Sequence, residues 1–148
     1  VTENGLTASQ CLQTDGETAP FFEELDSAYP MLGTGSVQIF MTEGVAGVTF
    51  DLDNATGKGF YEPSPWDPPP YTDPALEATS DTGSGGFVEV TAPNTVQIQL
   101  GGTPQDCVPV TGWPGPHNSV RTPVRENHVS IVVVQCPVPQ PVVLGGAP

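Results

Sequence analysis

Residues 79–100 read TSDTGSGGFVEVTAPNTVQIQL, and the pattern of this stretch decides the fold class. Its first part is rich in Gly, Ser and Asp, a composition typical of a flexible loop. The runs 87–91 and 96–100 then alternate apolar and polar residues with a period of two, which puts the two valines of the first run on one face. The Ala-Pro-Asn at 92–94 has the composition of a turn. The stretch therefore predicts a β-hairpin with one buried face.

Short alternating runs of the same kind recur along the chain. They predict further strands at residues 36–41, 48–52, 59–61, 105–110, 119–124 and 128–136. Residues 131–134 are apolar on both faces, as in a central strand, whereas residues 112–116 have turn composition. Residues 62–74 contain six prolines, which cannot donate to a strand ladder, so a surface loop is predicted there. About seven to nine short strands predict an all-β protein, a single antiparallel β-sandwich of the Ig-like kind.

The chain divides into three expected segments. Residues 1–35 are polar and acidic and predict an irregular N-terminal arm or plug, residues 36–136 form the sandwich, and residues 137–148 form a tail. Residues 20–28 could form one or two helical turns. The apolar side chains of these turns would either plug an open end of the sandwich or dock onto a neighbouring subunit.

Charge excludes two classes of partner. The chain has 148 residues and a net charge of −14, with Lys58, Arg121 and Arg125 as its fixed cations. Nucleic acid and anionic membranes are therefore poor partners. No apolar run approaches the roughly 18 residues needed to cross a bilayer, so membrane insertion is not expected.

The cysteines and the general composition favour secretion. The chain begins at Val1, which we interpret as a processed mature form, and it has little Lys but abundant Thr, Pro and Gly. Cys107 and Cys136 lie on two late β segments and are expected to form a disulfide. Cys11 is left over; it is either free or the true partner of one of the other two. No CxxC pair is present, so no structural metal site is predicted.

Three segments together resemble a known family. They are GVAGVTFDL at 44–52, ATSDTGSGGFVEVTAPNTVQIQL at 78–100 and VRTPVRENHVSIVVVQC at 120–136. In this order they are similar to the transthyretin-like, carboxypeptidase-regulatory-like sandwich modules of secreted proteins, over about residues 36–136. The resemblance implies a β-sandwich that is non-catalytic and serves as a spacer, adhesion or assembly domain.

One acidic cluster resembles a calcium loop in outline. Asp51 and Asp53 are followed by Glu62, eleven residues after Asp51, but the glycine and the helical flanks of such a loop are missing. A solvated acidic strand face is the favoured interpretation. No cofactor or metal is expected, and calcium at these three residues is the single weak candidate.

Catalytic residues are not apparent. Tyr61, Tyr71, His117 and His128 are the residue types of an iron-binding dioxygenase with a related sandwich fold. The two histidines, however, are separated by ten residues rather than closely spaced. No Ser/His/Asp arrangement is recognisable either. We therefore expect that the protein is not an enzyme.

Two kinds of glycan-related site are candidates. Trp66, Tyr71 and Trp113 lie on Pro-rich loops, where their rings could stack on sugars or pack against prolines or another subunit. The sequence Asn-Ala-Thr at 54–56 is an N-glycosylation sequon at a predicted turn, with Asn54 as the attachment site.

The leading functional hypothesis is a secreted, non-catalytic structural or assembly subunit at the cell surface. The apolar tail residues Val142, Val143 and Leu144 could add a strand to a sheet edge of the same or a neighbouring molecule, which would build filaments. The weakly basic region around Arg121 and Arg125 would favour such contacts with the acidic body. Partners are then the protein itself or other surface proteins. The alternatives are a carbohydrate-binding or adhesion module, and an accessory domain of a larger secreted enzyme.

Overall fold

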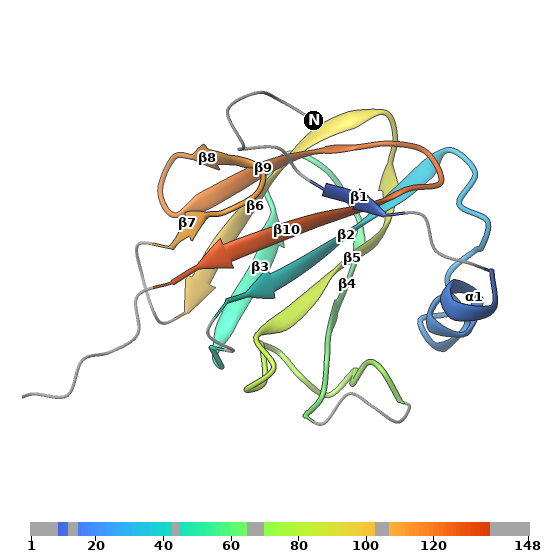
Figure 1. The fold of residues 1–148 in the computed structure, drawn as a ribbon, viewed down its shortest axis with the longest axis horizontal. Coiled ribbons are helices and arrows are strands. Elements are labelled where there is room, and N and C mark those ends of the chain that lie inside the picture. The colour runs from blue at the N-terminus through green and yellow to red at the C-terminus, as the bar shows by residue number, and fades with distance from the viewer. Residues whose placement is uncertain (1–8, 12–14, 43–44, 65–69, 103–106, 137–148) are drawn as a thin grey trace, which may run out of the picture.

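The protein is a sandwich of two β-sheets (Figure 1), so the predicted all-β fold is confirmed. The computed structural model describes residues 9–11, 15–42, 45–64, 70–102 and 107–136. The six-stranded sheet consists of β1 (Ser9–Cys11), β2 (Thr34–Met41), β4 (Lys58–Tyr61), β5 (Ser84–Thr91), β7 (Val108–Pro109) and β10 (Val129–Gln135). The four-stranded sheet consists of β3 (Val48–Leu52), β6 (Asn94–Gly102), β8 (Trp113–Gly115) and β9 (Ser119–Val124). Within the described residues, α1 (Asp15–Glu24) is the one helix.

The strand orders are β1-β10-β2-β5-β4 and β3-β6-β9-β8, and β7 pairs with β10 next to β1. All of these pairs are antiparallel except β10 with β2, which is parallel, so the fully antiparallel prediction needs this correction. The reason lies at the corner between β9 and β10. There the Ser36 N–H donates to His128 O at 3.0 Å and the Asn127 N–H donates to Thr34 O at 2.9 Å. Both strands therefore start at the same corner and run in the same direction.

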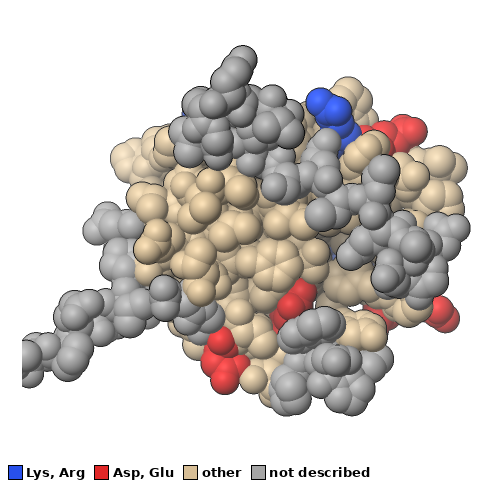
Figure 2. Space-filling model, viewed as in Figure 1, with Lys and Arg blue, Asp and Glu red and all other residues tan. Residues whose placement is uncertain are grey.

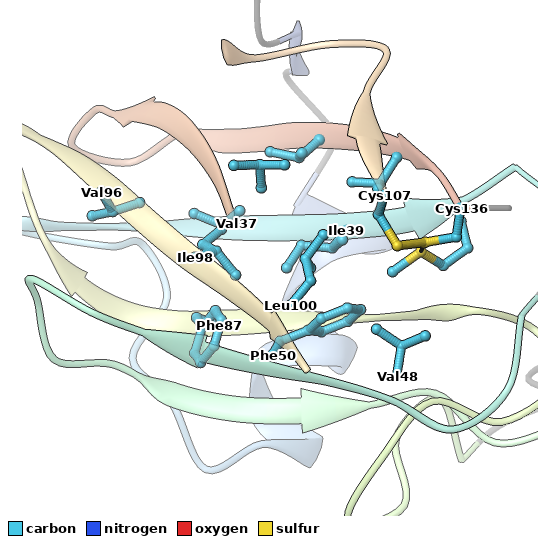
Figure 3. Close-up of a cluster of buried hydrophobic side chains, with 14 of the residues drawn as sticks. Val37, Ile39, Val48, Phe50, Phe87, Val96, Ile98, Leu100, Cys107 and Cys136 are labelled. Atoms are coloured by element: carbon cyan, nitrogen blue, oxygen red, sulfur yellow. Dashed lines mark hydrogen bonds between the residues drawn. A yellow bond between two sulfur atoms is a disulfide. The ribbon is translucent and has the colours of Figure 1, made fainter. Parts of the chain in front are cut away.

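The main hydrophobic core lies between the two sheets (Figure 3). Strands β2, β3, β5, β6, β9 and β10 contribute buried side chains to it, mostly at alternate positions, because successive residues of a strand point to opposite faces. The members from the strands are Val37, Ile39, Met41, Val48, Phe50, Phe87, Val90, Val96, Ile98, Leu100, Val120, Val124, Val132 and Val134. Fully burying a side chain of this kind contributes roughly 1.5–3 kcal/mol. The predicted Cys107–Cys136 disulfide is present and buried beside this cluster.

Strand β5 starts earlier than predicted, because it includes two glycines that were assigned to a loop. A Cβ atom at Gly86 would lie 2.0 Å from Val37 O, and one at Gly85 would lie 2.5 Å from Phe60 O. The glycines therefore allow β2 and β4 to approach β5 closely from both sides. Composition alone does not distinguish such a glycine from one in a flexible loop.

The alternation predicted for β5 also fails at one point. Glu89 has a φ of 60°, and the register between β2 and β5 shifts beside it. As a result Phe87 and Val90, three residues apart, both face the core, while Val88 faces the outside of the sheet. The two valines are therefore on opposite faces, because the irregular residue between them resets the period of two.

Strand β10 is central, as predicted, since it has neighbours along both edges. Strand β2 covers one edge, and β1 and β7 cover the two ends of the other. Thr111 fills the gap between β1 and β7: the Val133 N–H donates to its Oγ1 at 2.9 Å, and this Oγ1 donates to Ile131 O at 3.1 Å. The predicted turn at 112–116 instead contains strand β8.

The N-terminal region is more regular than predicted. Strand β1 belongs to the six-stranded sheet, and α1 begins five residues before the expected start at Pro20, which lies inside the helix. The helix does not plug an open end of the sandwich. Phe22 of the helix and Leu25, the first residue after it, pack on the outer face of the six-stranded sheet, in a second cluster with Met31, Phe60 and Val88. This packing on the chain's own sheet also argues against a docking arm.

Candidate functional site

The outer face of the six-stranded sheet is covered by α1 over one part only. The ring centroids of Phe21 and Phe60 lie 5.1 Å apart in an edge-to-face arrangement. Lys58 Nζ donates to Leu25 O just beyond the helix, and Glu24 accepts hydrogen bonds from the Tyr71 and Thr72 N–H groups at 3.0 and 2.6 Å. These contacts fix the helix over β4 and β5. The helix therefore does not cover most of β10 or the C-terminal half of β2.

The uncovered part of this face is uncharged and largely apolar. Strands β1, β2, β7 and β10 contain no charged residue, although the chain carries 17 acidic residues. Figure 2 is a view onto this face and shows uncharged atoms over β7, β10 and β2. We define the apolar face by the half-buried side chains of Phe40, Ile131 and Val133 together with Val108 and Val110, which are 56% and 44% exposed.

Register brings the members of the apolar face together. Phe40 pairs with Val133, and both point away from the core because their neighbours Ile39 and Val134 point into it. Val108 pairs with Gln135 at the end of β10. The described part of the chain exposes three large hydrophobic residues, Leu32, Val108 and Val110, and two of them border this face. Exposed apolar patches of this kind mark interaction surfaces.

A buried carboxyl group lies beside the apolar face. Glu62 is 7% exposed, and Gln38 Nε2 donates to Glu62 Oε1 at 3.2 Å. Burial raises the pKa of the Glu62 carboxyl, and the Ser84 hydroxyl and Gln38 amide offset the rise only in part. Ser84 Oγ is itself buried and makes no hydrogen bond of ordinary geometry with the described residues. The folded protein therefore holds a carboxyl that is easier to protonate than in the unfolded chain.

We expect Glu62→Gln to stabilise the protein more at pH 7 than at acidic pH. Below about pH 4 the Glu62 carboxyl of the wild type is mostly protonated in both the folded and the unfolded protein, so its burial carries little charge penalty. As the pH rises through the unfolded pKa toward the raised folded pKa, the wild type loses stability that the neutral glutamine retains. Urea unfolding across this pH range measures the difference. Glu77→Gln, at an exposed loop position, is the control. Equal pH profiles for both variants would contradict the expectation.

The outer face of the four-stranded sheet carries a different arrangement. One row of side chains crosses β8, β9 and β6: Trp113 pairs with Arg121, and Arg121 pairs with Gln97. Asp53 extends the row beyond the end of β3, where its N–H donates to Gln97 O at 3.0 Å. Arg121 Nε donates to Gln97 Oε1 at 3.1 Å, and Gln97 Nε2 donates to Asp53 Oδ2 at 2.9 Å. We call these four residues the polar row.

Several edge strands are closed by side chains or prolines. On β3 the Val48 N–H donates to Thr79 Oγ1 and the Phe50 N–H donates to the Tyr61 hydroxyl, each at 3.0 Å. Strands β7 and β8 contain Pro109 and Pro114, which have no N–H group. These edges leave few free backbone groups for an added strand. The tail residues predicted to add such a strand, Val142, Val143 and Leu144, lie outside the described residues.

The three carboxylates of the weak calcium candidate are not brought together. Asp51 and Asp53 are exposed on the side of the four-stranded sheet, whereas Glu62 is buried on the outer face of the six-stranded sheet. The body of the sandwich separates them. The described part of the chain contains no group of three or more His, Cys, Asp and Glu side chains that could hold a metal ion.

The aromatic residues predicted to stack on sugars are also dispersed. Tyr71 is anchored to Glu24 of α1, whereas Trp113 lies on β8, at the other side of the molecule (Figure 1). Trp66 lies outside the described residues. Any shared stacking platform of Tyr71 and Trp113 is therefore excluded, and Trp113 has the polar row as its neighbour instead.

The remaining predicted site residues have identifiable neighbours. Asn54 is exposed, but its side chain holds β6: Nδ2 donates to Thr95 O at 3.1 Å and Oδ1 accepts from the Gln97 N–H at 2.8 Å. Arg121 is part of the polar row, and Arg125 is exposed in the turn after β9. Of the dioxygenase-type residues, Tyr61 bonds the edge of β3, His117 lies between β8 and β9, and His128 precedes β10.

Sequence reasoning missed Phe40, Gln97 and Val108. The alternation does place Phe40 and Gln97 away from the core, which was the available signal. It does not say which residues of other strands lie beside them.

Comparison with known proteins gives no match: no protein-family model, no curated protein and no solved structure is significantly similar to the chain. The resemblance to transthyretin-like modules therefore stays a prediction. Among the described residues, no helix has the length and apolar character to cross a membrane.

Proposed function

We propose that the protein is a secreted, non-catalytic β-sandwich module that assembles with copies of itself through the apolar face. The observation that carries this proposal is the lack of charged residues in β1, β2, β7 and β10 of a chain with a net charge of −14. At other surfaces, two copies of so acidic a protein repel each other. At the apolar face they can approach without opposing charges and bury Val108, Val110 and Phe40.

A secreted structural role agrees with two further features. The Cys107–Cys136 bond is compatible with secretion, because disulfides form and persist mainly in oxidising compartments. Of the residues that could serve an iron dioxygenase, Tyr61 already uses its hydroxyl to bond the edge of β3, and His128 Nδ1 lies 2.7 Å from Glu126 O. These features support a module that binds and assembles at the cell surface.

The form of the assembly follows from symmetry. One self-complementary face on each molecule gives a closed two-fold dimer. A filament needs a second, different contact, and the tail at 137–148 is the candidate segment for it. Deleting residues 138–148 is therefore expected to leave the dimer intact and to abolish any longer polymer.

Sedimentation velocity over a range of protein concentrations tests the proposal. The variant Val108→Asp/Val110→Asp places two charges at exposed positions of the apolar face, where little stability is at risk. The matched control, Thr91→Asp/Thr95→Asp, adds the same charge at exposed positions of β5 and β6. We expect the wild type and the control to dimerise and the first variant to stay monomeric. A monomeric wild type at all concentrations, or equal dimerisation of both variants, would overturn the proposal.

A further inference from the structure

We propose that the outer face of the four-stranded sheet binds a neutral oligosaccharide, which lies along the polar row with one sugar stacked on Trp113. This site is on the side of the sandwich opposite the apolar face and does not depend on the assembly proposed above. It would make the protein a carbohydrate-binding module whose binding face crosses β3, β6, β9 and β8.

The polar row has the hydrogen-bonding chemistry that sugar hydroxyls require. Each hydroxyl is a donor and an acceptor, so neighbouring hydroxyls match planar groups that offer two polar atoms side by side. The row provides three such groups: the Asp53 carboxylate, the Gln97 amide and the Arg121 guanidinium. Acceptors lie at the Asp53 end and donors at the Arg121 end. Asp53 Oδ1, one Nε2–H of Gln97 and the Nη groups of Arg121 have no partner among the described residues.

The row is held in place before any ligand arrives. The bonds of 2.9 Å from Gln97 to Asp53 and 3.1 Å from Arg121 to Gln97 fix the plane of each group. The Gln97 main chain is fixed as well, because its N–H donates to Asn54 Oδ1 at 2.8 Å. Side chains that are already ordered lose little conformational entropy on binding, which favours affinity.

Trp113 supplies the apolar part of the site. It is half-buried on the edge strand β8, directly across from Arg121. Arg121 Nε is directed toward Gln97 and β6, so the hydrogen-bonded part of the guanidinium points away from the indole. An accessible indole packs well against the C–H face of a sugar ring, which is flat and apolar.

The dimensions and the surroundings of the row fit a short chain of sugars. Neighbouring strands lie about 4.8 Å apart, so four strands span about 14 Å, roughly the length of three sugar rings. Gly115 lies two residues after Trp113 on β8 and therefore on the same face of the sheet. A Cβ atom there would lie 2.3 Å from Ser119 Oγ and 3.5 Å from Gln97 Oε1. The glycine therefore keeps side-chain atoms away from the centre of the row.

Charge restricts the ligand to neutral sugars. The polar row contains one cation and one anion and is balanced by itself. The remainder of the chain is strongly acidic, with a net charge of −14, and repels anionic polysaccharides.

Affinity gel electrophoresis of the full chain on soluble β-glucan, xylan and galactomannan tests this site. We expect the wild type to be retarded by at least one of these neutral polysaccharides. Trp113→Ala and, separately, Asp53→Ala/Gln97→Ala should weaken that retardation at least about tenfold. Trp66→Ala serves as the matched tryptophan control and should bind like the wild type.

Two safeguards keep the result decisive. Circular dichroism melting of each variant shows whether it folds, and the double variant tests the site if Trp113→Ala does not fold. The change in Trp113 fluorescence on binding, followed in the Trp66→Phe background, is an independent readout. The proposal is wrong if no polysaccharide retards the wild type, or if the folded site variants bind as the wild type does. Loss of binding in Trp66→Ala alone would also overturn it.

Discussion

Reduction of the Cys107–Cys136 disulfide is expected to lower the free energy of unfolding by about 3–4 kcal/mol. The bond joins residues 29 positions apart and closes a loop that contains the whole of β7, β8, β9 and β10. The cross-link lowers the conformational entropy of the unfolded chain and so stabilises the folded state relative to it. This stabilisation is lost once the bond is broken. Urea unfolding of a Cys11→Ser variant with and without reductant measures the difference, because both states have the same atoms at every other position.

Thiol counting is the control for this prediction. With the disulfide formed, one thiol of the wild type, that of Cys11, should react after unfolding without reductant, and none should react in Cys11→Ser. Three reactive thiols in the wild type, or unfolding curves that coincide with and without reductant, would contradict the expectation.

The second large effect is expected for Gly86→Ala, which should destabilise the protein by roughly 3 kcal/mol or more or prevent folding. The added Cβ atom would lie 2.0 Å from Val37 O, inside the backbone of the neighbouring strand. Gly86 also pairs with Gln38 on one side and Phe60 on the other. The clash can therefore be relieved only by moving β2 away from β5, which opens the centre of the six-stranded sheet.

Gly59→Ala is the matched control for this substitution. It lies on the adjacent strand β4, is exposed, and a Cβ atom there would meet its nearest neighbour, a Phe87 ring carbon, at 3.5 Å. We expect this variant to unfold within about 0.5 kcal/mol of the wild type. Similar midpoints of urea unfolding for the two alanine variants would show that β2 and β5 do not approach each other closely at Gly86.

The alternation of apolar and polar residues predicted the strands correctly wherever the backbone keeps a regular period of two. Strands β3 and β9 have the predicted bounds, and β10 is central as its apolar core indicates. The pattern failed where the backbone departs from the ideal period. Gly86 lies in strand β5, where any side chain would collide with Val37 O of the neighbouring strand. The positive φ of Glu89 interrupts the alternation of β5, so that Val88 and Val90 lie on opposite faces. Such features depend on the neighbouring strand and leave no signal in the local sequence.

The candidate sites were less predictable than the fold for a related reason. Trp113 and Arg121 were noticed singly, but the polar row exists only through pairing, which joins Arg121 to Gln97, 24 residues away. The apolar face likewise combines Phe40 with Val133, far apart in the chain and adjacent in the parallel pair of β2 and β10. Alternation assigns each residue a face, whereas strand order decides its neighbours.

Site-specific photo-cross-linking tests the proposed assembly most directly. The photoreactive residue p-benzoylphenylalanine would replace Val108 on the apolar face in one variant and Thr95 on β6 of the other sheet in a second, both at exposed positions. Irradiation is expected to give a covalent dimer from position 108 and monomer from position 95. No dimer from position 108, or equal dimer yields from both positions, would contradict assembly through the apolar face.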